Sequence, residues 1–464
     1  MAERPVISYE DLAPQREYMR KVAAFAKRPQ SYHIVTLGCQ MNERDSETLA
    51  GMLDEMGLRP EPVREEADLI LYNTCCVREN AENRALGNVI WLKELKKKKP
   101  DLVICVGGCM TQEKGMAELM KQRYPFIDIV FGTHNMHAFP EYLYKLLESH
   151  QPVIEVLDTD GAVIEGLPER RESAFSAYVN IMYGCNNFCS YCIVPYVRGR
   201  ERSRDPEAVL EEAKRLRDAG VKEIMLLGQN VNSYRGGGAE FANLLYRLDA
   251  LEIPRIRFMT SHPKDLSDEL IAAFGELRHL MPQLHLPVQA GSDEILRVMN
   301  RRYTRAHYLD LVRRLRKVCP EIGLTSDIIV GFPGETLPQF EETLSLIEEV
   351  RFDSAFTFIY SPRKGTRAAE MPDDTPYEVK SERIQRLIDR QQEISREILL
   401  QQVGRRETVL VESVSARDAE SVGGKTPRGH MVNFPGNADL IGSFAEVEIV
   451  SAGRNTLRGR LIEK

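Results

Sequence analysis

The sequence predicts an α/β protein built from three parts: an N-terminal open parallel α/β sheet, a central partial (β/α)6 barrel and a C-terminal small antiparallel β-barrel. Apolar runs alternate with helical patterns over residues 31–150 and again over 171–402, and this order is typical of parallel sheets. Residues 404–464 instead alternate polar and apolar side chains between glycine-containing turns, as small β-barrels do. Residues 1–30 are polar and are predicted to form an appendage.

The composition is that of a globular protein. The chain has 464 residues, of which 43% are hydrophobic and 28% charged, and its length favours about three domains. No apolar run is long enough to span a membrane, so no membrane partner is expected. The nine cysteines come without a secretory signal, which predicts a reducing, cytoplasmic location.

Three cysteines follow the predicted strands of the N-terminal sheet. Cys39, Cys75 and Cys109 each lie in the loop just after the carboxyl end of a strand. The strands are expected at residues 32–37, 69–73 and 102–106. Because the carboxyl ends of parallel strands meet at one edge of a sheet, the three thiols are expected to meet at one point. The presence of a cysteine in the equivalent loop after each of three strands predicts an iron–sulfur cluster.

The other thiols of this region leave one choice open. Cys76 follows Cys75 directly, so the spacing allows either residue to be the ligand. Cys105 lies within its strand and is expected to point into the sheet as a small hydrophobic side chain. Cys319, at the end of a helical stretch, has the same interpretation.

The central part shows six strand signals with helices between them. They lie at residues 177–182, 223–227, 255–260, 283–288, 323–330 and 354–360. Six units rather than eight indicate an incomplete barrel, whose chemistry is expected at the carboxyl ends of the strands. Polar side chains stand at these ends where a packed core would not need them, namely Gln229, Ser261, Gln289 and Asp327.

One of these polar residues lies inside an apolar strand. The Asp327 carboxylate should therefore have a partner. A ribose diol is one candidate, and a structural bond to a backbone N–H group or an arginine is the alternative. His262, beside Ser261, is interpreted as a loop cap.

The most specific motif follows the first strand of the barrel. Cys185, Cys189 and Cys192 are spaced C-x3-C-x2-C. Three thiolates can hold three irons of a 4Fe-4S cube and leave the fourth iron open to a small molecule. Structural zinc would need a fourth ligand nearby, a disulfide framework would need an oxidising compartment, and a C-x2-C redox pair would not explain Cys185.

The complete motif set resembles the radical S-adenosylmethionine (SAM) methylthiotransferases. The resemblance rests on the sequences TLGCQMN at residues 36–42, NTCCVR at 73–78, GGCM at 107–110, CNNFCSYC at 185–192 and IVPYVRGR at 193–200. It covers nearly all of residues 30–464 and implies an N-terminal cluster domain, a radical SAM partial barrel and a C-terminal TRAM domain that binds RNA. Segments 199–204 and 228–234 look most like the branch that modifies N6-isopentenyladenosine in tRNA.

The resemblance also implies the cofactors. Two 4Fe-4S clusters are expected, one on Cys185, Cys189 and Cys192 and an auxiliary one on Cys39, Cys75 and Cys109, where the family pattern selects Cys75 over Cys76. Two SAM molecules are expected per turnover, one as methyl donor and one as radical source, with the sulfur drawn from the auxiliary cluster. No protein side chain is expected to be catalytic, because the cofactor carries the difficult chemistry. The candidate SAM contacts are Tyr191, Gln229, Ser261, Gln289 and Asp327.

The implied partners are an RNA and a reductant. The RNA is the tRNA anticodon stem-loop with N6-isopentenyladenosine 3′ of the anticodon, and the electrons come from an external donor such as flavodoxin or ferredoxin. The net charge of −7 gives no general attraction to RNA, so local basic segments must supply it. The candidates are Arg198, Arg200, Arg202 and Arg204 beside the cysteine loop, and Lys425 and Arg428 in the C-terminal part, where Phe434 offers a stacking face.

Two alternatives stay open at this stage. A sibling methylthiotransferase would act on N6-threonylcarbamoyladenosine in tRNA or on an aspartate of a ribosomal protein, and only pocket-level differences separate it. A non-enzymatic iron–sulfur protein that binds RNA or transfers electrons would not cleave SAM. The C-terminal barrel can equally be a structural cap.

Overall fold

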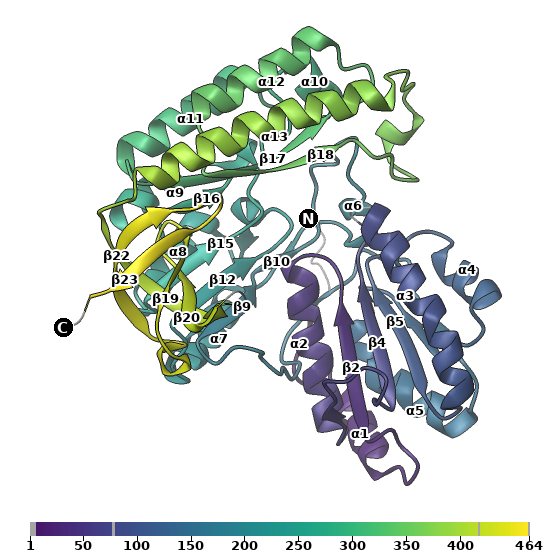
Figure 1. Ribbon diagram of the computed structural model, residues 1–464. Helices are drawn as coiled ribbons and strands as arrows, with labels where there is room; N and C mark the ends of the chain where they lie inside the picture. Colours follow the sequence, from purple (N-terminus) through teal and green to yellow (C-terminus); the bar gives the residue numbers. More distant parts are fainter. Residues whose placement is uncertain (1–5, 77–78, 416–417, 463–464) are drawn as a thin grey trace.

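The computed structural model describes residues 6–76, 79–415 and 418–462. Val77 and Arg78, which end the NTCCVR motif, and the first five residues of the predicted appendage lie outside this part of the chain. The N-terminal sheet, the partial barrel and the C-terminal barrel follow one another in sequence, and the N-terminal sheet stands beside the partial barrel (Figure 1). The predicted fold class is confirmed.

The N-terminal domain is a six-stranded parallel sheet in the order β3-β2-β4-β5-β6-β7. Its strands are β2 Ser31–Thr36, β3 Arg59–Pro60, β4 Leu69–Thr74, β5 Val103–Gly108, β6 Ile129–Phe131 and β7 Val153–Glu155. The three predicted strands correspond to β2, β4 and β5. The other three are only two or three residues long, too short for a recognisable pattern.

Five helices accompany this sheet: α1 Ala13–Ala24, α2 Gln40–Glu55, α3 Glu79–Lys98, α4 Met116–Arg123 and α5 Phe139–Ser149. The core on one face joins α1, α2 and α5 to the sheet and includes Met19, Leu49 and Phe139. A second core joins α3 and α4 to the other face. The segment predicted to be an appendage therefore contributes α1 to the first core, and its strand β1, Val6–Ile7, pairs with β8, Val163–Ile164.

The central domain contains the six predicted parallel strands as two three-stranded sheets, β9-β12-β15 and β16-β17-β18. A single bridge between Ile256 and Leu280 joins the halves into an open barrel. The strands are β9 Ser176–Asn180, β12 Glu223–Leu227, β15 Arg255–Phe258, β16 Gln283–His285, β17 Gly323–Val330 and β18 Ser354–Ile359. The helices are α7 Pro206–Asp218, α8 Phe241–Asp249, α9 Asp268–Glu276, α10 Asp293–Val298, α11 Arg305–Val318, α12 Leu337–Val350 and α13 Tyr377–Leu400.

The segments around the cysteine loop and after β12 contain short elements: β10 Met182–Tyr183, α6 Val194–Val197, β11 Arg202–Ser203, β13 Arg235–Gly236 and β14 Ala239–Glu240. In Figure 1, α6 lies between the partial barrel and α3 of the N-terminal domain. The chain therefore crosses the boundary between the domains directly after the three-cysteine loop.

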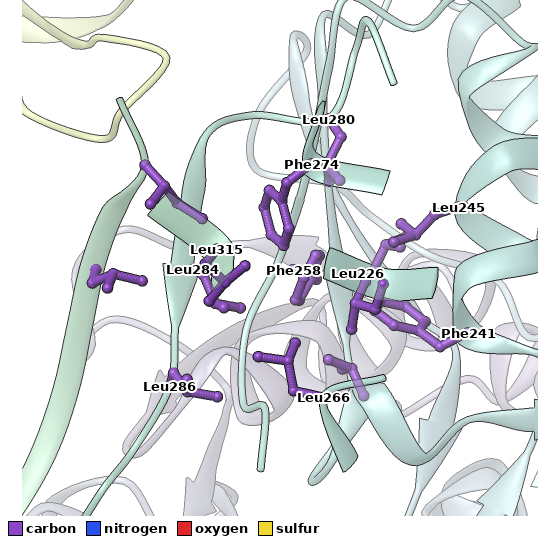
Figure 2. Close-up of a cluster of buried hydrophobic side chains, with 14 of the residues drawn as sticks. Leu226, Phe241, Leu245, Phe258, Leu266, Phe274, Leu280, Leu284, Leu286 and Leu315 are labelled. Carbon is purple, nitrogen blue, oxygen red and sulfur yellow. The ribbon is translucent and has the colours of Figure 1, made fainter. Parts of the chain in front are cut away.

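A continuous apolar core fixes the barrel strands (Figure 2). Phe258 of β15 makes edge-to-face contact with Phe241 of α8, with ring centroids 5.0 Å apart, and also packs against Phe274 of α9. Aromatic pairs of this kind add about 1 kcal/mol each beyond the area they bury. The packing holds the strand ends in place, and those ends carry the polar loops.

The C-terminal domain is a closed barrel in the order β19-β20-β21-β23-β22. Its strands are β19 Arg406–Ser415, β20 Asp418–Lys425, β21 Met431–Pro435, β22 Phe444–Ala452 and β23 Leu457–Leu461. All pairs are antiparallel except β21 with β23, which is parallel. Phe434 is buried in the core of this barrel, so it cannot offer the predicted stacking face. No helix in the described part of the chain is long and apolar enough to cross a membrane.

Candidate active site

The three-cysteine loop of the barrel faces a buried cation. Arg301 is only 4% exposed, and its Nη1 donates to Cys189 Sγ at 3.3 Å while its Nη2 donates to the carbonyl of Pro287 at 2.7 Å. Burial raises the pKa of Cys185 to about 12, so that thiol is neutral until a metal displaces its proton. The positive charge of Arg301 can then balance part of the negative charge that thiolates bring into the site.

The second set of cysteines surrounds the start of α2. Asn42 Oδ1 lies 3.8 Å from Cys39 Sγ and 3.9 Å from Cys109 Sγ. Cys75 approaches the same place from β4, because a Cβ atom added to Gly38 would lie 3.2 Å from its Sγ. Gly38 has a φ of 129°, in the region that favours glycine, and this lets the loop pass close to Cys75. The structure thus brings together the three thiols that the strand ends predicted.

Two further thiols lie close in sequence to these three. Cys76 is fully buried in the same core as Cys109, with Val106 and Met110. Its hydrogen bond with Cys109 lowers the pKa of Cys109 to about 6, with a smaller effect from the charge of Arg198. Cys105 belongs to the core on the opposite face of the sheet, as its position within the strand predicted.

Neither set is arranged around a single ion. Among residues 6–76, 79–415 and 418–462, no three His, Cys, Asp or Glu side chains are placed to hold one metal ion together. A 4Fe-4S cube binds each cysteine through a different iron, so its ligands stand farther apart than the ligands of one zinc ion. Two sets of three thiols, each beside a buried arginine, are chemically suited to such cubes.

Arg198 connects the two sets. It is 6% exposed, and its Nε donates to Cys109 Sγ at 3.1 Å while its Nη2 pairs with Asp45 at 2.8 Å. Ile193 and Val197, two buried apolar residues at the ends of the α6 turn, belong to the same core as Cys109. Arg198 lies six positions after Cys192, a separation of on the order of 10 Å at the rise of a helix. One short segment therefore links the cysteine loop of the barrel to the cysteines of the sheet.

The prediction that four arginines of this segment face RNA needs correction. Arg198 is engaged as described, and Arg204 is buried between Glu165 at 2.6 Å and Glu212 at 2.7 Å. Arg202 is also buried and donates to the carbonyls of Arg198 and Arg200. These three guanidinium groups are therefore buried and already bonded to other groups of the protein. Arg200 alone is exposed.

A polar cavity of about 280 Å³ lies where the sheet meets the barrel. Its wall includes Arg44 of α2, which pairs with Glu169 and, at 3.3 Å, with Glu212 of α7. Tyr178 of β9 donates to Glu43 of α2 at 2.6 Å across the same boundary. The Arg44–Glu212 pair is largely buried and therefore costly to break, so it helps to fix how the two cysteine sets face each other.

The predicted SAM contacts all lie at the carboxyl edge of the barrel. Gln229 accepts a hydrogen bond from the backbone N–H of Gly184, next to the cysteine loop, and the Tyr191 ring meets Phe332 edge-on. Gln289 has a φ of 74°, an uncommon value outside glycine. The Asp327 carboxylate lies 3.5 Å from Nε2 of His285. The partner that Asp327 was expected to need is therefore a histidine, and the carboxylate stays partly exposed.

Buried polar atoms without a hydrogen-bond partner gather at this edge. Within the described chain they include Oδ1 of Asn180, Oδ1 of Asn230, Oγ of Ser261, Nε2 of His262 and the hydroxyl of Tyr360. Asn180 ends β9, and the others follow β12, β15 and β18. Because unpaired buried polar groups are costly, this edge fits a polar ligand such as SAM. His262 does cap its loop, since its Nδ1 accepts from the N–H of Lys264 at 3.2 Å.

Sequence reasoning missed four residues that contact the cysteine loops or the candidate SAM contacts. They are Asn42, His285, Asn300 and Arg301. Arg301 lies in a basic segment that is visible in the sequence, but nothing there indicates that the side chain points inward. Asn42 lies in the TLGCQMN motif and could have been noticed for its place three residues after Cys39.

The basic residues of the C-terminal barrel also differ from expectation. Arg428 pairs with Asp353 of the central domain at 2.6 Å, and His430 lies 2.8 Å from the same carboxylate. Lys425 pairs with Glu412 at 3.1 Å and remains partly exposed. Arg428 therefore docks the C-terminal barrel onto the partial barrel, and its assignment as a phosphate contact is corrected.

Replacing Asp353 by asparagine should weaken this docking and destabilise the protein by about 3 kcal/mol, because it leaves Arg428 without its buried partner. Burial raises the pKa of Asp353, but hydrogen bonds from His430 and Arg428 hold it below its ordinary value. The carboxylate thus stabilises the wild type above about pH 4, and this contribution is lost as pH falls through the lowered pKa.

Calorimetric unfolding across this pH range measures the effect. The melting temperatures of wild type and D353N should differ at neutral pH and converge in acid. The exposed Asp439, on the same small barrel, provides D439N as a control with no expected change. A constant difference at all pH values would contradict the assignment.

The comparisons with known proteins agree with this architecture. The radical SAM superfamily matches residues 179–347, the Uncharacterized protein family UPF0004 matches residues 31–132, and the TRAM domain matches residues 400–462. A radical S-adenosylmethionine methyltransferase, TsrM, from Kitasatospora setae has a similar fold, with a TM-score of 0.53 at 15% identity over 73% of this chain and 77% of that one. The fold and the cysteine loop define a radical SAM protein.

Curated relatives narrow the assignment. The tRNA-2-methylthio-N(6)-dimethylallyladenosine synthase of Thermoanaerobacter sp. (strain X514) is 52% identical over 462 residues, covering 98% of each chain. That of Clostridium botulinum (strain Langeland / NCTC 10281 / Type F) is 52% identical over 436 residues, covering 93% of this chain and 97% of the relative. The chain belongs to the family of tRNA-2-methylthio-N(6)-dimethylallyladenosine synthases.

Proposed function

We propose that this enzyme converts N6-isopentenyladenosine, 3′ of the anticodon in tRNA, to its 2-methylthio derivative. The family assignment supports the reaction, and the TRAM domain supports an RNA substrate. It acts in the cytoplasm with an external electron donor such as flavodoxin or ferredoxin. The sibling reactions on threonylcarbamoyladenosine or a ribosomal aspartate are not favoured, because the relatives at 52% identity carry the isopentenyladenosine name.

Two sets of residues hold the cofactors in this proposal. Cys185, Cys189 and Cys192 would hold a 4Fe-4S cluster, and the unpaired polar atoms at the carboxyl edge of the barrel would bind SAM beside it. When bound there, the cluster and SAM supply the radical chemistry that removes an unreactive aromatic C–H hydrogen. Arg301 balances charge at this site, while Tyr191, Gln229, Ser261, Gln289 and Asp327 are the candidate SAM contacts.

The other set would hold the sulfur source. Cys39, Cys75 and Cys109 would bind an auxiliary 4Fe-4S cluster, with Arg198 donating to Cys109. One SAM would serve as methyl donor and a second as radical source in each turnover. The proposal needs no side-chain acid or base, and the protein groups orient the reactants and exclude water from them.

The observation that carries this proposal is the contact of Arg198 with the cysteines of the sheet. Arg198 lies six positions after Cys192 and contacts Cys109, so the two sets of thiols would lie on either side of one region. A single purine placed there can meet a radical source on one side and a sulfur donor on the other. The adenine must leave its stack to enter, and an unpaired anticodon loop makes this inexpensive.

The test is anaerobic reconstitution with iron and sulfide, followed by SAM, reductant and a synthetic RNA hairpin carrying N6-isopentenyladenosine 3′ of the anticodon. We expect 5′-deoxyadenosine and the 2-methylthio nucleoside in the digested RNA. A non-enzymatic iron–sulfur protein would release no 5′-deoxyadenosine. Modification of a threonylcarbamoyladenosine hairpin instead would identify the sibling reaction.

A further inference from the structure

A strained aromatic residue stands in the middle of the cysteine loop. Phe188, just before Cys189, has a φ of 48°, a left-handed value that is unfavourable for a bulky residue. Asn300 holds it there, because its Nδ2 donates to the carbonyls of Phe188 at 2.9 Å and of Asn187 at 3.1 Å. Strain that the surroundings maintain is concentrated at functional sites, so the position of this ring calls for an explanation.

Two side chains rest on the Phe188 ring. The Arg200 guanidinium lies over it at 4.4 Å from the centroid, and the Tyr196 ring meets it edge-on at 5.9 Å and 90°. Tyr196 is 49% exposed and Arg200 is exposed. Unlike Arg198 and Arg204, Arg200 forms no ion pair with any residue that the structure describes.

The backbone fixes this arrangement next to the cysteines. The N–H of Cys185 donates to the carbonyl of Gly199 at 3.1 Å, and that of Asn186 donates to Glu201 at 3.1 Å. These bonds hold the loop of Phe188 against the segment of Arg200. Phe188, Tyr196 and Arg200 thus form a preorganised surface patch, with an exposed ring and an unpaired cation, beside the site where the adenine is proposed to react.

We propose that the patch of Phe188, Tyr196 and Arg200 binds one unpaired nucleotide adjacent to the reacting adenosine, with its base stacked on Tyr196 and its phosphate paired with Arg200. The inference rests on the proposed function. Stacking on an aromatic ring tolerates any base, and a single arginine suits one phosphate. An adenosine drawn out of its stack leaves its neighbour without a stacking partner, and the patch would replace that partner.

Binding of the wild-type protein to three RNA hairpins tests the proposal directly. One hairpin carries N6-isopentenyladenosine in an intact loop, and the others lack the base on its 5′ or its 3′ side. Removal of one of the two neighbouring bases should weaken binding about tenfold. If neither removal changes the affinity, the proposal is wrong. If the intact hairpin does not bind at all, the proposed function fails with it.

Variants localise the effect. Y196A should weaken binding of the intact hairpin about tenfold. It should not further weaken binding of the abasic hairpin that binds less tightly to the wild type. Y196F, which keeps the aromatic ring, should bind the intact hairpin as the wild type does. The matched control is W91A, because Trp91 is an exposed ring under Arg64, 4.5 Å away, on α3. Unchanged hairpin affinity of Y196A with slower cluster reduction by flavodoxin would overturn the proposal in favour of a docking surface for the donor.

Discussion

Replacing Cys189 by alanine is expected to abolish formation of 5′-deoxyadenosine and to leave only the auxiliary cluster after reconstitution. A cube held by three thiolates cannot be retained by two, and no described histidine or carboxylate completes a metal-binding set at this loop. Iron and sulfide per chain should therefore fall to about half of the wild-type content. The amount of 5′-deoxyadenosine formed and the iron and sulfide per chain should be measured on the same preparation.

The auxiliary cluster serves as an internal control for folding in C189A. Arg301 keeps its bonds to Pro287 and Tyr303 in this variant, so the loop should remain in place. C319A is the matched control for loss of a thiol, since Cys319 is half-buried at the end of α11 and distant in sequence from both sets. Wild-type levels of 5′-deoxyadenosine in C189A would contradict the assignment.

The positions of the cysteines could be predicted because they depend on local order. A thiol just after a strand lies at the carboxyl edge of a parallel sheet whatever the rest of the chain does, so Cys39 and Cys109 meet near Asn42 as expected. The six strands of the partial barrel were predictable for a related reason. Their length and the periodicity of the intervening helices are local properties.

The arginines were not predictable because their partners are remote in sequence. Arg198 pairs with Asp45 of the other domain, and Arg204 pairs with Glu165, 39 residues earlier. A basic run shows the charge but not the carboxylate that neutralises it. The burial of Phe434 was not predictable either. In a small barrel, a shift of one residue in strand register decides whether a ring faces the core or the solvent.

Among the cysteines of the sheet, replacement of Cys109 or Cys75 by alanine should remove the auxiliary cluster and stop sulfur insertion. Formation of 5′-deoxyadenosine should continue, because the loop of Cys185, Cys189 and Cys192 is intact. C105A should retain the auxiliary cluster, since that thiol packs in the core on the opposite face. The readouts are iron content, the spectrum of the auxiliary cluster and the amount of 2-methylthio nucleoside.

The variant that decides between the adjacent thiols is C76A. Cys75 approaches Gly38, next to Cys39, whereas Cys76 is fully buried and bonds to Cys109 instead. We therefore expect C76A to keep the auxiliary iron and C75A to lose it. The reverse result would make Cys76 the ligand in place of Cys75. Loss of auxiliary iron in C105A alone would make Cys105 the ligand in place of Cys109. Only the C105A result would remove the contact of Arg198 with Cys109 as the link between the two sets, because exchange of Cys75 and Cys76 leaves Cys109 a ligand.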